Sequence, residues 1–277
     1  MPELPEVETV RRGLIKIAKG KKINNIDVYY GKTITNDVEE FKQDLIGQTI
    51  DDINRRGKYL LFRFSNNLTM ISHLRMEGKY FNQQIGDELD KHTHVVFQFT
   101  DGSELCYNDT RKFGRMTLVK TGDEMNVAGL KTIGPEPTEK DFKIDFFKDE
   151  LKKSRGKIKP FLLSQQHVAG LGNIYVDEVL WMSKINPEQP ANTITDEQAQ
   201  VLHDNIIKEL ATAIKYKGTT VHSFANAMGD AGAFQNMLHA YGHDGEKCSR
   251  CGAEMVKIKV AQRGTTFCPH CQPLVED

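Results

Sequence analysis

Residues 248–271 read CSRCGAEMVKIKVAQRGTTFCPHC, and they decide how the last part of this chain folds. Cys248 and Cys251 form one Cys-x₂-Cys pair, and Cys268 and Cys271 form a second pair after sixteen intervening residues. This spacing is typical of two β-knuckles that close one tetrahedral zinc site. Four protein ligands leave the metal no open position, so the sequence predicts one structural Zn²⁺ ion that does no chemistry itself.

The rest of the composition is that of an ordinary globular protein, with 277 residues of which 39% are hydrophobic and 27% charged. No apolar run reaches the roughly 18 residues of a membrane helix, and the first residues lack the basic and apolar layout of a signal peptide. We therefore expect a cytoplasmic monomer with no membrane partner. The cysteines then do not form a disulfide framework, and Cys106 is expected to be a small buried side chain in a strand.

Two strips of the chain are basic although the net charge is only −1. Residues 152–159 carry five cations and no acid, and within residues 248–271 four cations oppose one glutamate. A near-neutral chain can still bind a polyanion through such strips. Each strip taken alone is better explained as a solvated helix end or loop.

Hydrophobic periodicity divides the chain into a β-rich part and a helical part. Apolar residues recur at three- and four-residue steps over 4–18, which predicts a helix that Gly20 ends. Short alternating runs separated by turn residues over 23–120 predict a β-sandwich or flattened barrel. Residues 141–216 return to helical periodicity, and the clearest helix starts at Thr195.

Pro2 and Glu3 have the residue types for covalent chemistry at the amino end. Removal of Met1 would leave Pro2 a free secondary amine, and terminal amines titrate near about 7.7–8.0. Attack of that amine on an aldehyde-like carbon gives a permanently cationic iminium, and Glu3 could transfer protons beside it. Without the rest of the chain, the simpler interpretation is a helix start with carboxylates at its positive end.

The stretch GLGNIY at 170–175 has too few glycines, and no preceding strand, for a dinucleotide fingerprint. A short turn between helices whose backbone N–H groups face an anion is more plausible. Asn173 is expected at the start of the following helix, where N-capping is its simplest role.

Six segments together resemble the formamidopyrimidine-DNA glycosylase family, in order and with compatible spacing from the first residues to nearly the last. They are MPELPEVETV at 1–10, RGKYLLF at 56–62, HLRMEG at 73–78, DTRKFG at 109–114, GLGNIYVDE at 170–178 and QRGTTFCPHCQ at 262–272.

The resemblance implies a bifunctional DNA glycosylase and AP lyase of base excision repair. In this family the N-terminal proline, here Pro2, attacks C1′ of a damaged purine nucleotide and forms a Schiff base, while Glu3 matches the acid/base residue. Lys58 matches the lysine associated with β-elimination, and Arg263 matches the zinc-finger arginine assigned to δ-elimination. The implied substrates are 8-oxoguanine and formamidopyrimidines, and the implied partner is double-stranded DNA that contains oxidised purines or abasic sites.

The resemblance also implies how DNA is held. Extruding a nucleotide leaves a gap, and the residues matching the family's gap fillers are Met76, Arg111 and Phe113. The residues matching its phosphate contacts are His92, Arg111, Arg155 and Asn173. Taken alone, Met76 and Phe113 would more often fill a core, and His92 could be an exposed turn residue. The sequence departs from the common family pattern at Arg75, where many relatives have glycine, and at Lys112, where a second arginine is usual.

The implied fold is α+β, with an N-terminal helix plus β-sandwich domain, a helical helix-two-turn-helix domain and a C-terminal four-cysteine zinc finger. We expect the catalytic β-sandwich domain over 1–130, a linker over 131–145, the helical DNA-binding domain over 146–240 with a lesion loop near 219–240, and the zinc finger over 241–277. Two alternatives remain open. One is the sister branch, endonuclease VIII, which prefers oxidised pyrimidines, and the other is a zinc-ribbon protein that binds nucleic acid without catalysis.

Overall fold

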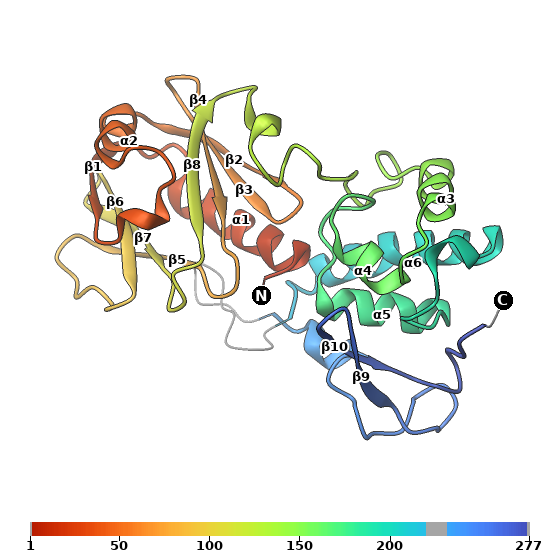
Figure 1. The fold of residues 1–277 in the computed structure, drawn as a ribbon. Coiled ribbons are helices and arrows are strands. Elements are labelled where there is room, and N and C mark those ends of the chain that lie inside the picture. The colour runs from red at the N-terminus through yellow and green to blue at the C-terminus, as the bar shows by residue number, and fades with distance from the viewer. Residues whose placement is uncertain (1, 220–231, 276–277) are drawn as a thin grey trace. The chain divides into compact units, whose positions relative to one another are not determined.

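The computed structural model of this protein describes residues 2–219 and 232–275 (Figure 1). The chain divides into two compact units. The first unit holds residues 1–131 and 217–233, and the second holds residues 132–216 and 234–277. The expected mixture of a sheet-rich part and a helical part is confirmed. Most of the lesion loop expected near 219–240 lies outside the described residues.

The first unit begins with helix α1 (Leu4–Ala18), at the place that the periodicity predicts. Glu3 is the N-cap residue, and its backbone N–H donates to Oε2 of Glu6 at 2.8 Å. Apolar residues three and four apart give α1 one buried face, and they are Val7, Val10 and Leu14. Gly20 follows the helix with φ +81°, a backbone conformation that glycine adopts without strain.

Two antiparallel four-stranded sheets make up most of the first unit, which confirms the predicted sandwich. One sheet has the order β1 (Ile23–Val28), β6 (Thr93–Phe99), β7 (Ser103–Asn108), β5 (Lys79–Gln84). The other has the order β2 (Ile50–Arg56), β3 (Tyr59–Phe64), β4 (Leu68–His73), β8 (Arg115–Lys120). Apolar side chains from both sheets, from α1 and from α2 form one continuous core.

Helix α2 (Val38–Leu45) interrupts the region that the sequence assigned to strands alone. Its N-cap is Asp37, whose carboxylate accepts the backbone N–H groups of Glu39 and Glu40. Phe41 is one of its two buried side chains. The cap and the four-residue apolar spacing were present in the sequence, but eight residues give a weaker periodic signal than the strands around them.

The chain crosses between the two sheets twice in the region that matters for the site. Residues 74–78 lead from β4 in one sheet to β5 in the other, and residues 109–114 lead back from β7 to β8. Since β5 and β7 are hydrogen-bonded neighbours, with Tyr80 opposite Tyr107, these two crossing segments start or end on adjacent strands. They are the segments HLRMEG and DTRKFG that carry the family resemblance.

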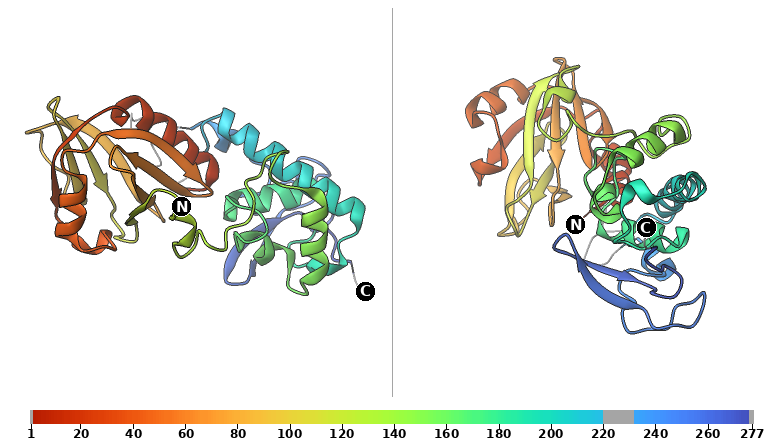
Figure 2. Two further views of the ribbon diagram at one scale, coloured as in Figure 1. Left: turned by 90° about the horizontal axis from the view of Figure 1, so that it is seen from above. Right: turned by 45° about the vertical axis from the view of Figure 1, so that its right-hand side comes forward.

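The second unit is helical and closes with a β-hairpin (Figure 2). Its elements are α3 (Ile144–Lys153), α4 (Ile158–Leu163), α5 (Asn173–Ser183), α6 (Asp196–Lys215), β9 (Val256–Val260) and β10 (Arg263–Phe267). Helix α6 starts at the predicted N-cap Thr195, in a capping box with Gln198. Helix α5 is buried along most of its length because it packs against α4, α6 and β10.

Short 3₁₀ turns complete the described structure at Gly31–Thr33, Glu124–Asn126, Ala191–Thr193 and Phe234–Met237. Within residues 2–219 and 232–275, every helix is too short or too polar to cross a lipid bilayer.

Candidate active site and nucleic-acid contacts

The start of α1 is firmly held. Pro2 is buried and Glu3 is only 2% exposed. Glu6 contributes through both carboxylate oxygens, because Oε2 accepts from the backbone of Glu3 and Oε1 accepts the N–H of Thr219 at 2.8 Å. Gly218 has φ +73°, and a Cβ there would lie 2.5 Å from Oε1 of Glu6, so only glycine fits beside this carboxylate. The amino-terminal residues therefore lie in an ordered setting.

Lys58 lies in the tight turn between β2 and β3 and is 7% exposed. Gly57 takes φ +53° in this turn, and its carbonyl oxygen accepts from Nη1 of Arg55 at 2.8 Å. Arg55 also donates through Nε to Oε2 of Glu8 on α1 at 3.2 Å. One arginine therefore joins the turn that carries Lys58 to the helix that starts at Pro2 and Glu3.

Glu8 is the anionic centre of this connection. Burial alone would raise the pKa of its carboxyl group, but hydrogen bonds from Arg11 and Arg12 and the charge of Arg55 outweigh burial and lower the pKa to about 2. The carboxylate is therefore ionised across the physiological pH range, and it stabilises the packing of α1 on β2.

The segment HLRMEG turns sharply directly after His73, which is neutral. Burial, together with the nearby cations Arg75 and Lys58, lowers the pKa of His73 to about 3. Its Nδ1 is therefore free to accept the backbone N–H of Arg75 at 2.9 Å. Arg75 has φ +54°, a left-handed backbone conformation that glycine adopts with less strain than arginine. The next residue, Met76, is half-buried.

The segment DTRKFG folds around one buried carboxylate. Asp109 accepts the backbone N–H groups of Arg111 at 3.0 Å, Phe113 at 2.9 Å and Gly114 at 2.7 Å. The guanidinium of Arg111 lies 4.8 Å from the ring centroid of Phe113. Phe113 is 48% exposed, so the alternative that it fills the core is wrong. Lys112, like Arg75, has a left-handed backbone with φ +59°.

The other predicted phosphate contacts outside the zinc finger lie on the surface or partly so. Arg155 is exposed in the segment after α3. His92 is half-buried, its N–H donates to Oδ1 of Asp90 at 2.7 Å, and its carbonyl oxygen accepts the N–H of Asp109 at 3.0 Å.

Asn173 is the first residue of α5, as the sequence predicts, but it does not cap the helix. Gly172 is the N-cap residue, and Nδ2 of Asn173 donates to the carbonyl oxygen of Gly264 at 2.9 Å. Oδ1 of Asn173 is buried and has no hydrogen-bond partner in the described part of the chain. The N-capping interpretation is therefore wrong, and the side chain connects α5 to the hairpin instead.

Arg263 is exposed at the start of β10, directly after the two-residue turn of the hairpin. Ala261 and Gln262 form that turn with φ +46° and +65°. Both central residues have the positive φ of a type I′ turn, which suits the twist of a β-hairpin but costs free energy for residues other than glycine. The turn therefore fixes where the backbone of Arg263 lies at the start of β10.

A buried ion pair anchors this hairpin to the helices. Nζ of Lys159 lies 2.6 Å from Oδ1 of Asp177, and both side chains are at most 1% exposed. Lys159 also donates to the carbonyl oxygen of Gly264 at 3.0 Å, while Oδ2 of Asp177 accepts the N–H of Thr266 at 3.0 Å. Burial raises the pKa of Asp177 to about 6 although Lys159 opposes that shift.

The four cysteines of residues 248–271 come together as predicted. Their Sγ atoms all lie within 4.8 Å of one another, and those of Cys251 and Cys268 are 3.5 Å apart. Tetrahedral Zn²⁺ with Zn–S bonds of about 2.3 Å needs S–S separations of about 3.8 Å, so the cluster fits one zinc ion.

Trp181 supplies a further observation that fits thiolate ligands. Its Nε1 is buried and finds no oxygen or nitrogen acceptor among the described residues, and Cys248 is the side chain it faces. Although burial would raise the pKa of Cys248, the indole N–H and the backbone amides of Arg250 and Cys251 lower it to about 6. The ring of Trp181 stacks on His239 at 4.6 Å and lies 3.9 Å from the guanidinium of Arg250.

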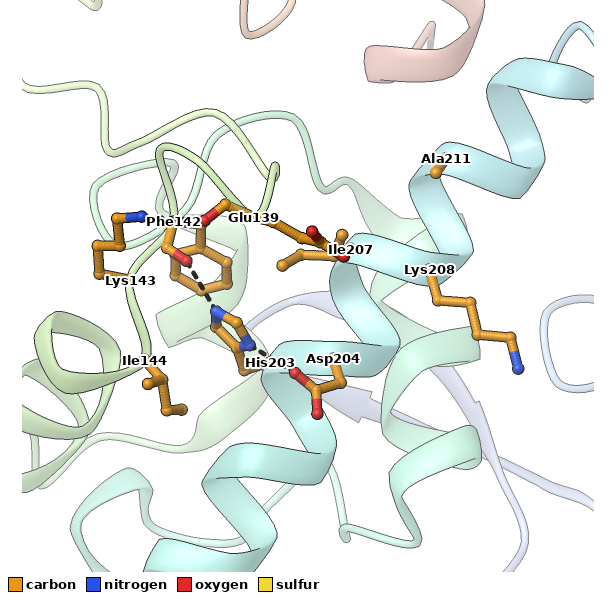
Figure 3. Close-up of a pocket in the computed structure, with 9 residues that line it drawn as sticks. All are labelled: Glu139, Phe142, Lys143, Ile144, His203, Asp204, Ile207, Lys208 and Ala211. Carbon is orange, nitrogen blue, oxygen red and sulfur yellow. Dashed lines mark hydrogen bonds and ion pairs between the residues drawn. The ribbon is translucent and has the colours of Figure 1, made fainter.

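One well-formed pocket lies between residues 139–144 and α6 and has a volume of about 600 Å³ (Figure 3). His203 in its wall contacts the carbonyl oxygen of Phe142 through Nε2 and a carboxylate oxygen of Asp204 through Nδ1, both at 2.8 Å. Its best-placed polar group is therefore already used for structure, and its lining contains none of the predicted site residues. This pocket therefore does not coincide with the predicted site.

Three families of known proteins match the chain in order. They are the formamidopyrimidine-DNA glycosylase N-terminal domain over residues 1–116, the formamidopyrimidine-DNA glycosylase H2TH domain over 133–225, and the zinc finger found in FPG and IleRS over 245–274. A β-sandwich with an ordered Pro-Glu start, an H2TH domain and a four-cysteine finger define a zinc-finger DNA glycosylase.

Relatives and solved structures extend this match over almost the full length. The formamidopyrimidine-DNA glycosylase of Lactiplantibacillus plantarum is 61% identical over 97% of this chain and 98% of its own. The crystal structure of the wild-type Lactococcus lactis Fpg (MutM) in complex with DNA containing N7-benzyl-Fapy-dG is 50% identical, with a TM-score of 0.94, and covers 98% of this chain and all of that one. A complex of the L. lactis Fpg with DNA containing an abasic site gives a TM-score of 0.93 at 49% identity, over 98% of this chain and 99% of that one. This chain belongs to the formamidopyrimidine-DNA glycosylase family.

Four residues that the sequence analysis did not select hold the predicted site residues or their segments in place. Asp109 holds the turn of Arg111 and Phe113, Lys159 and Asp177 anchor the hairpin of Arg263, and Trp181 faces the zinc ligands. Asp109 and Asp177 belong to segments quoted for the resemblance, and Lys159 lies in the basic strip. No local signal indicates that Lys159 and Asp177 form a buried pair, because their contact joins elements eighteen residues apart.

Proposed function

We propose that this protein is a bifunctional DNA glycosylase and AP lyase of base excision repair. It removes oxidised purines, namely 8-oxoguanine and formamidopyrimidines, and then cleaves the strand at the empty sugar. Membership of the family supports this proposal, as do the relatives solved with Fapy-dG and abasic DNA. The observation that carries it is the ordered, buried start of α1 at Pro2 and Glu3, where a chain end would otherwise fray.

The nucleophile is the secondary amine of Pro2, which requires that Met1 has been removed. Its lone pair forms a bond to C1′ of the damaged nucleotide, and the electrons of the glycosidic bond leave with the base, which takes up a proton. The amine then loses its proton, the C1′–O4′ bond opens, and O4′ is protonated by Glu3. The product is an iminium at C1′ with no N–H proton to lose, because all the bonds of the proline nitrogen go to carbon.

The same iminium drives strand cleavage. Its positive charge acidifies the C2′–H bond, so a base can remove that proton while the 3′-phosphate leaves in β-elimination. A second elimination expels the 5′-phosphate, and water then releases the sugar fragment from Pro2. Lys58 and Arg263 assist these two eliminations as cations that bind the flanking phosphates. The lowered pKa of His73, to which the charge of Lys58 contributes, keeps that histidine neutral, so it does not add a second cation beside the lysine.

DNA is held open by the two crossing segments. Met76 is the wedge that enters the gap left by the extruded nucleotide, and Arg111 and Phe113 meet the orphaned partner base. His92, Arg155 and Asn173 contact backbone phosphates, which gives affinity without sequence preference. The partial exposure of Met76 and Phe113 supports their role, since an apolar side chain on a surface is available to DNA bases.

Zinc is structural in this proposal, held by the four cysteines of residues 248–271 so that the hairpin can present Arg263 to DNA. We also propose the domain division expected from the sequence, with a catalytic β-sandwich over 1–130, a linker over 131–145, a helical DNA-binding domain over 146–240 and the zinc finger over 241–277. The cellular compartment that fits a DNA repair enzyme of bacterial relatives is the cytoplasm.

Borohydride trapping tests the proposal directly. Wild-type protein is incubated with duplex DNA containing 8-oxoguanine, the iminium is reduced, and the cross-linked peptide is mapped by mass spectrometry. We expect one covalent complex through the nitrogen of Pro2, and none in a preparation that retains Met1, because an acylated nitrogen cannot attack. Tight binding without any trapped complex would favour the non-catalytic zinc-ribbon alternative. Faster release of thymine glycol than of 8-oxoguanine would favour the pyrimidine-directed branch.

A further inference from the structure

Tyr107 lies beside both crossing segments, residues 74–78 and 109–114. It is on β7, directly opposite Tyr80 on β5, and it is 1% exposed. Its hydroxyl group is buried and makes no hydrogen bond of good geometry to any described residue. The family resemblance assigns this residue no role, and burying a hydroxyl without a well-formed hydrogen bond costs free energy, so its position needs a physical explanation.

The hydroxyl of Tyr107 fills the space that two side chains would need. A Cβ at Gly78 would lie 2.4 Å from this oxygen, and a Cβ at Gly114 would lie 1.6 Å from it. Both distances are far below any real contact, so glycine is required at both positions. Gly78 ends the segment that carries Met76, and Gly114 ends the segment that carries Arg111 and Phe113. One oxygen atom therefore touches the backbones of both segments.

Asp109 completes this arrangement from inside the second segment. Its side chain interacts with the Tyr107 hydroxyl, and its Oδ2 would lie 3.2 Å from a Cβ at Gly114, which places both oxygens around the same glycine. The same Oδ2 accepts the N–H groups of Phe113 and Gly114. Asp109 is fully buried, and its carbonyl oxygen contacts Nε2 of His94 at 2.7 Å, so its own position is fixed by β6.

We propose that Tyr107 and Asp109 are positioning residues that fix the distance between the Met76 wedge and the Arg111–Phe113 pair. This inference rests on the proposed function, because it concerns the residues that fill the gap in DNA. The Met76 side chain and the Arg111–Phe113 pair must enter the same base step of the DNA together. Misplacement of a reacting or positioning group by about 1 Å can lower a rate a hundredfold. Two segments that each cross between the sheets need a common reference, and the Tyr107 hydroxyl provides it.

Tyr107→Phe tests the proposal, because it removes only this hydroxyl. Tyr80→Phe is the matched control, since Tyr80 faces Tyr107 across the strands and its hydroxyl bonds Ser72 at 2.7 Å instead of the two glycines. Both variants are first checked for thermal unfolding. 2-Aminopurine beside the lesion then reports base unstacking, and single-turnover rates are measured for excision of 8-oxoguanine and for trapping on a preformed abasic site.

We expect Tyr107→Phe to lower the unstacking signal and to slow excision of 8-oxoguanine by about ten- to a hundredfold. Trapping on the abasic site should change less than threefold, because no base has to be extruded there and the Pro2 chemistry is intact. Tyr80→Phe should leave both rates unchanged. Asp109→Asn, which replaces one carboxylate oxygen by an amide donor, should show the same split as Tyr107→Phe.

Two results would overturn the inference. In one, Tyr107→Phe excises 8-oxoguanine and unstacks DNA as the wild type does. In the other, it loses excision and abasic-site trapping in equal proportion, which indicates general damage to the unit. Failure of the proposed function is recognised separately, because the wild-type protein itself would then form no trapped complex.

Discussion

Substitution Lys159→Met should destabilise the helical unit strongly, because it leaves the carboxylate of Asp177 buried without its cation. Methionine preserves the length and much of the volume of the lysine side chain, so packing changes little. The two side chains are at most 1% exposed, and removing one partner of such a buried pair costs about 3–5 kcal/mol. The lost hydrogen bond to the carbonyl oxygen of Gly264 is included in this range.

The chain provides its own probe for this measurement. It contains a single tryptophan, Trp181, which belongs to α5 in the same unit as Lys159 and Asp177. Urea unfolding followed by tryptophan fluorescence, with zinc present, therefore reports on this unit alone. The loss of unfolding free energy in Lys159→Met should be smaller at pH 5 than at pH 7.5. Burial already raises the pKa of Asp177 to about 6, and removal of the cation raises it further. At pH 5 the carboxyl group of the variant is therefore protonated, and no buried charge remains.

The double variant Lys159→Met/Asp177→Leu separates charge from packing. Replacing both partners by apolar residues removes the uncompensated charge, so we expect it to recover most of the stability that the single variant loses. A loss below about 1 kcal/mol in Lys159→Met, or a double variant no more stable than the single one, would refute the reasoning.

Three further predictions address other parts of the molecule. Glu8→Gln should lower the free energy of unfolding by roughly 3 kcal/mol at pH 7, because the folded pKa of Glu8 is lowered from 4.5 to about 2. This stabilisation is complete above pH 4.5 and is lost as the pH falls toward 2. The hydrogen-exchange rates of the α1 amides in variant and wild type should therefore converge near pH 2. Trp181→Phe keeps a ring for His239 and Arg250 but lacks the N–H that faces Cys248, and a colorimetric chelator should remove its zinc about tenfold faster; equal rates would show that the indole N–H does not support the thiolate. Arg75→Gly should raise the thermal stability of the sheet-rich unit by about 0.5–1 kcal/mol, since φ +54° is strained for arginine, and Lys112→Gly at φ +59° should act alike; lower melting temperatures for both would contradict the strain argument.

Periodicity and caps made much of the fold predictable. The limits of α1 and the start of α6 at Thr195 follow from local signals, because a helix start is fixed by the few residues around it. The zinc site was also predictable, since its ligands come in two short pairs. Helix α2 was missed because its eight residues lie among strands whose alternating pattern dominates the region.

The supporting residues could not be derived in the same way. The environment of Tyr107 depends on Gly78 and Gly114, which approach it only once both sheets have formed. The strain at Arg75 is likewise a property of a backbone angle, which the sequence indicates only through a departure from glycine. Asn173 could not be assigned correctly from its neighbours in the sequence. Its place at a helix start suggests a cap, but its side chain donates to the carbonyl oxygen of Gly264, 91 residues further along the chain.

The hairpin turn at Ala261 and Gln262 has a consequence for how the enzyme can follow its substrate. The strand that follows the turn is held at two points, because Lys159 and Asn173 donate to the carbonyl oxygen of Gly264 and Asp177 accepts the N–H of Thr266. Any travel of the Arg263 guanidinium must then come from rotation about its own side-chain bonds. Under the proposed function, this rotation lets the cation follow a phosphate through the two eliminations while the hairpin backbone stays in place.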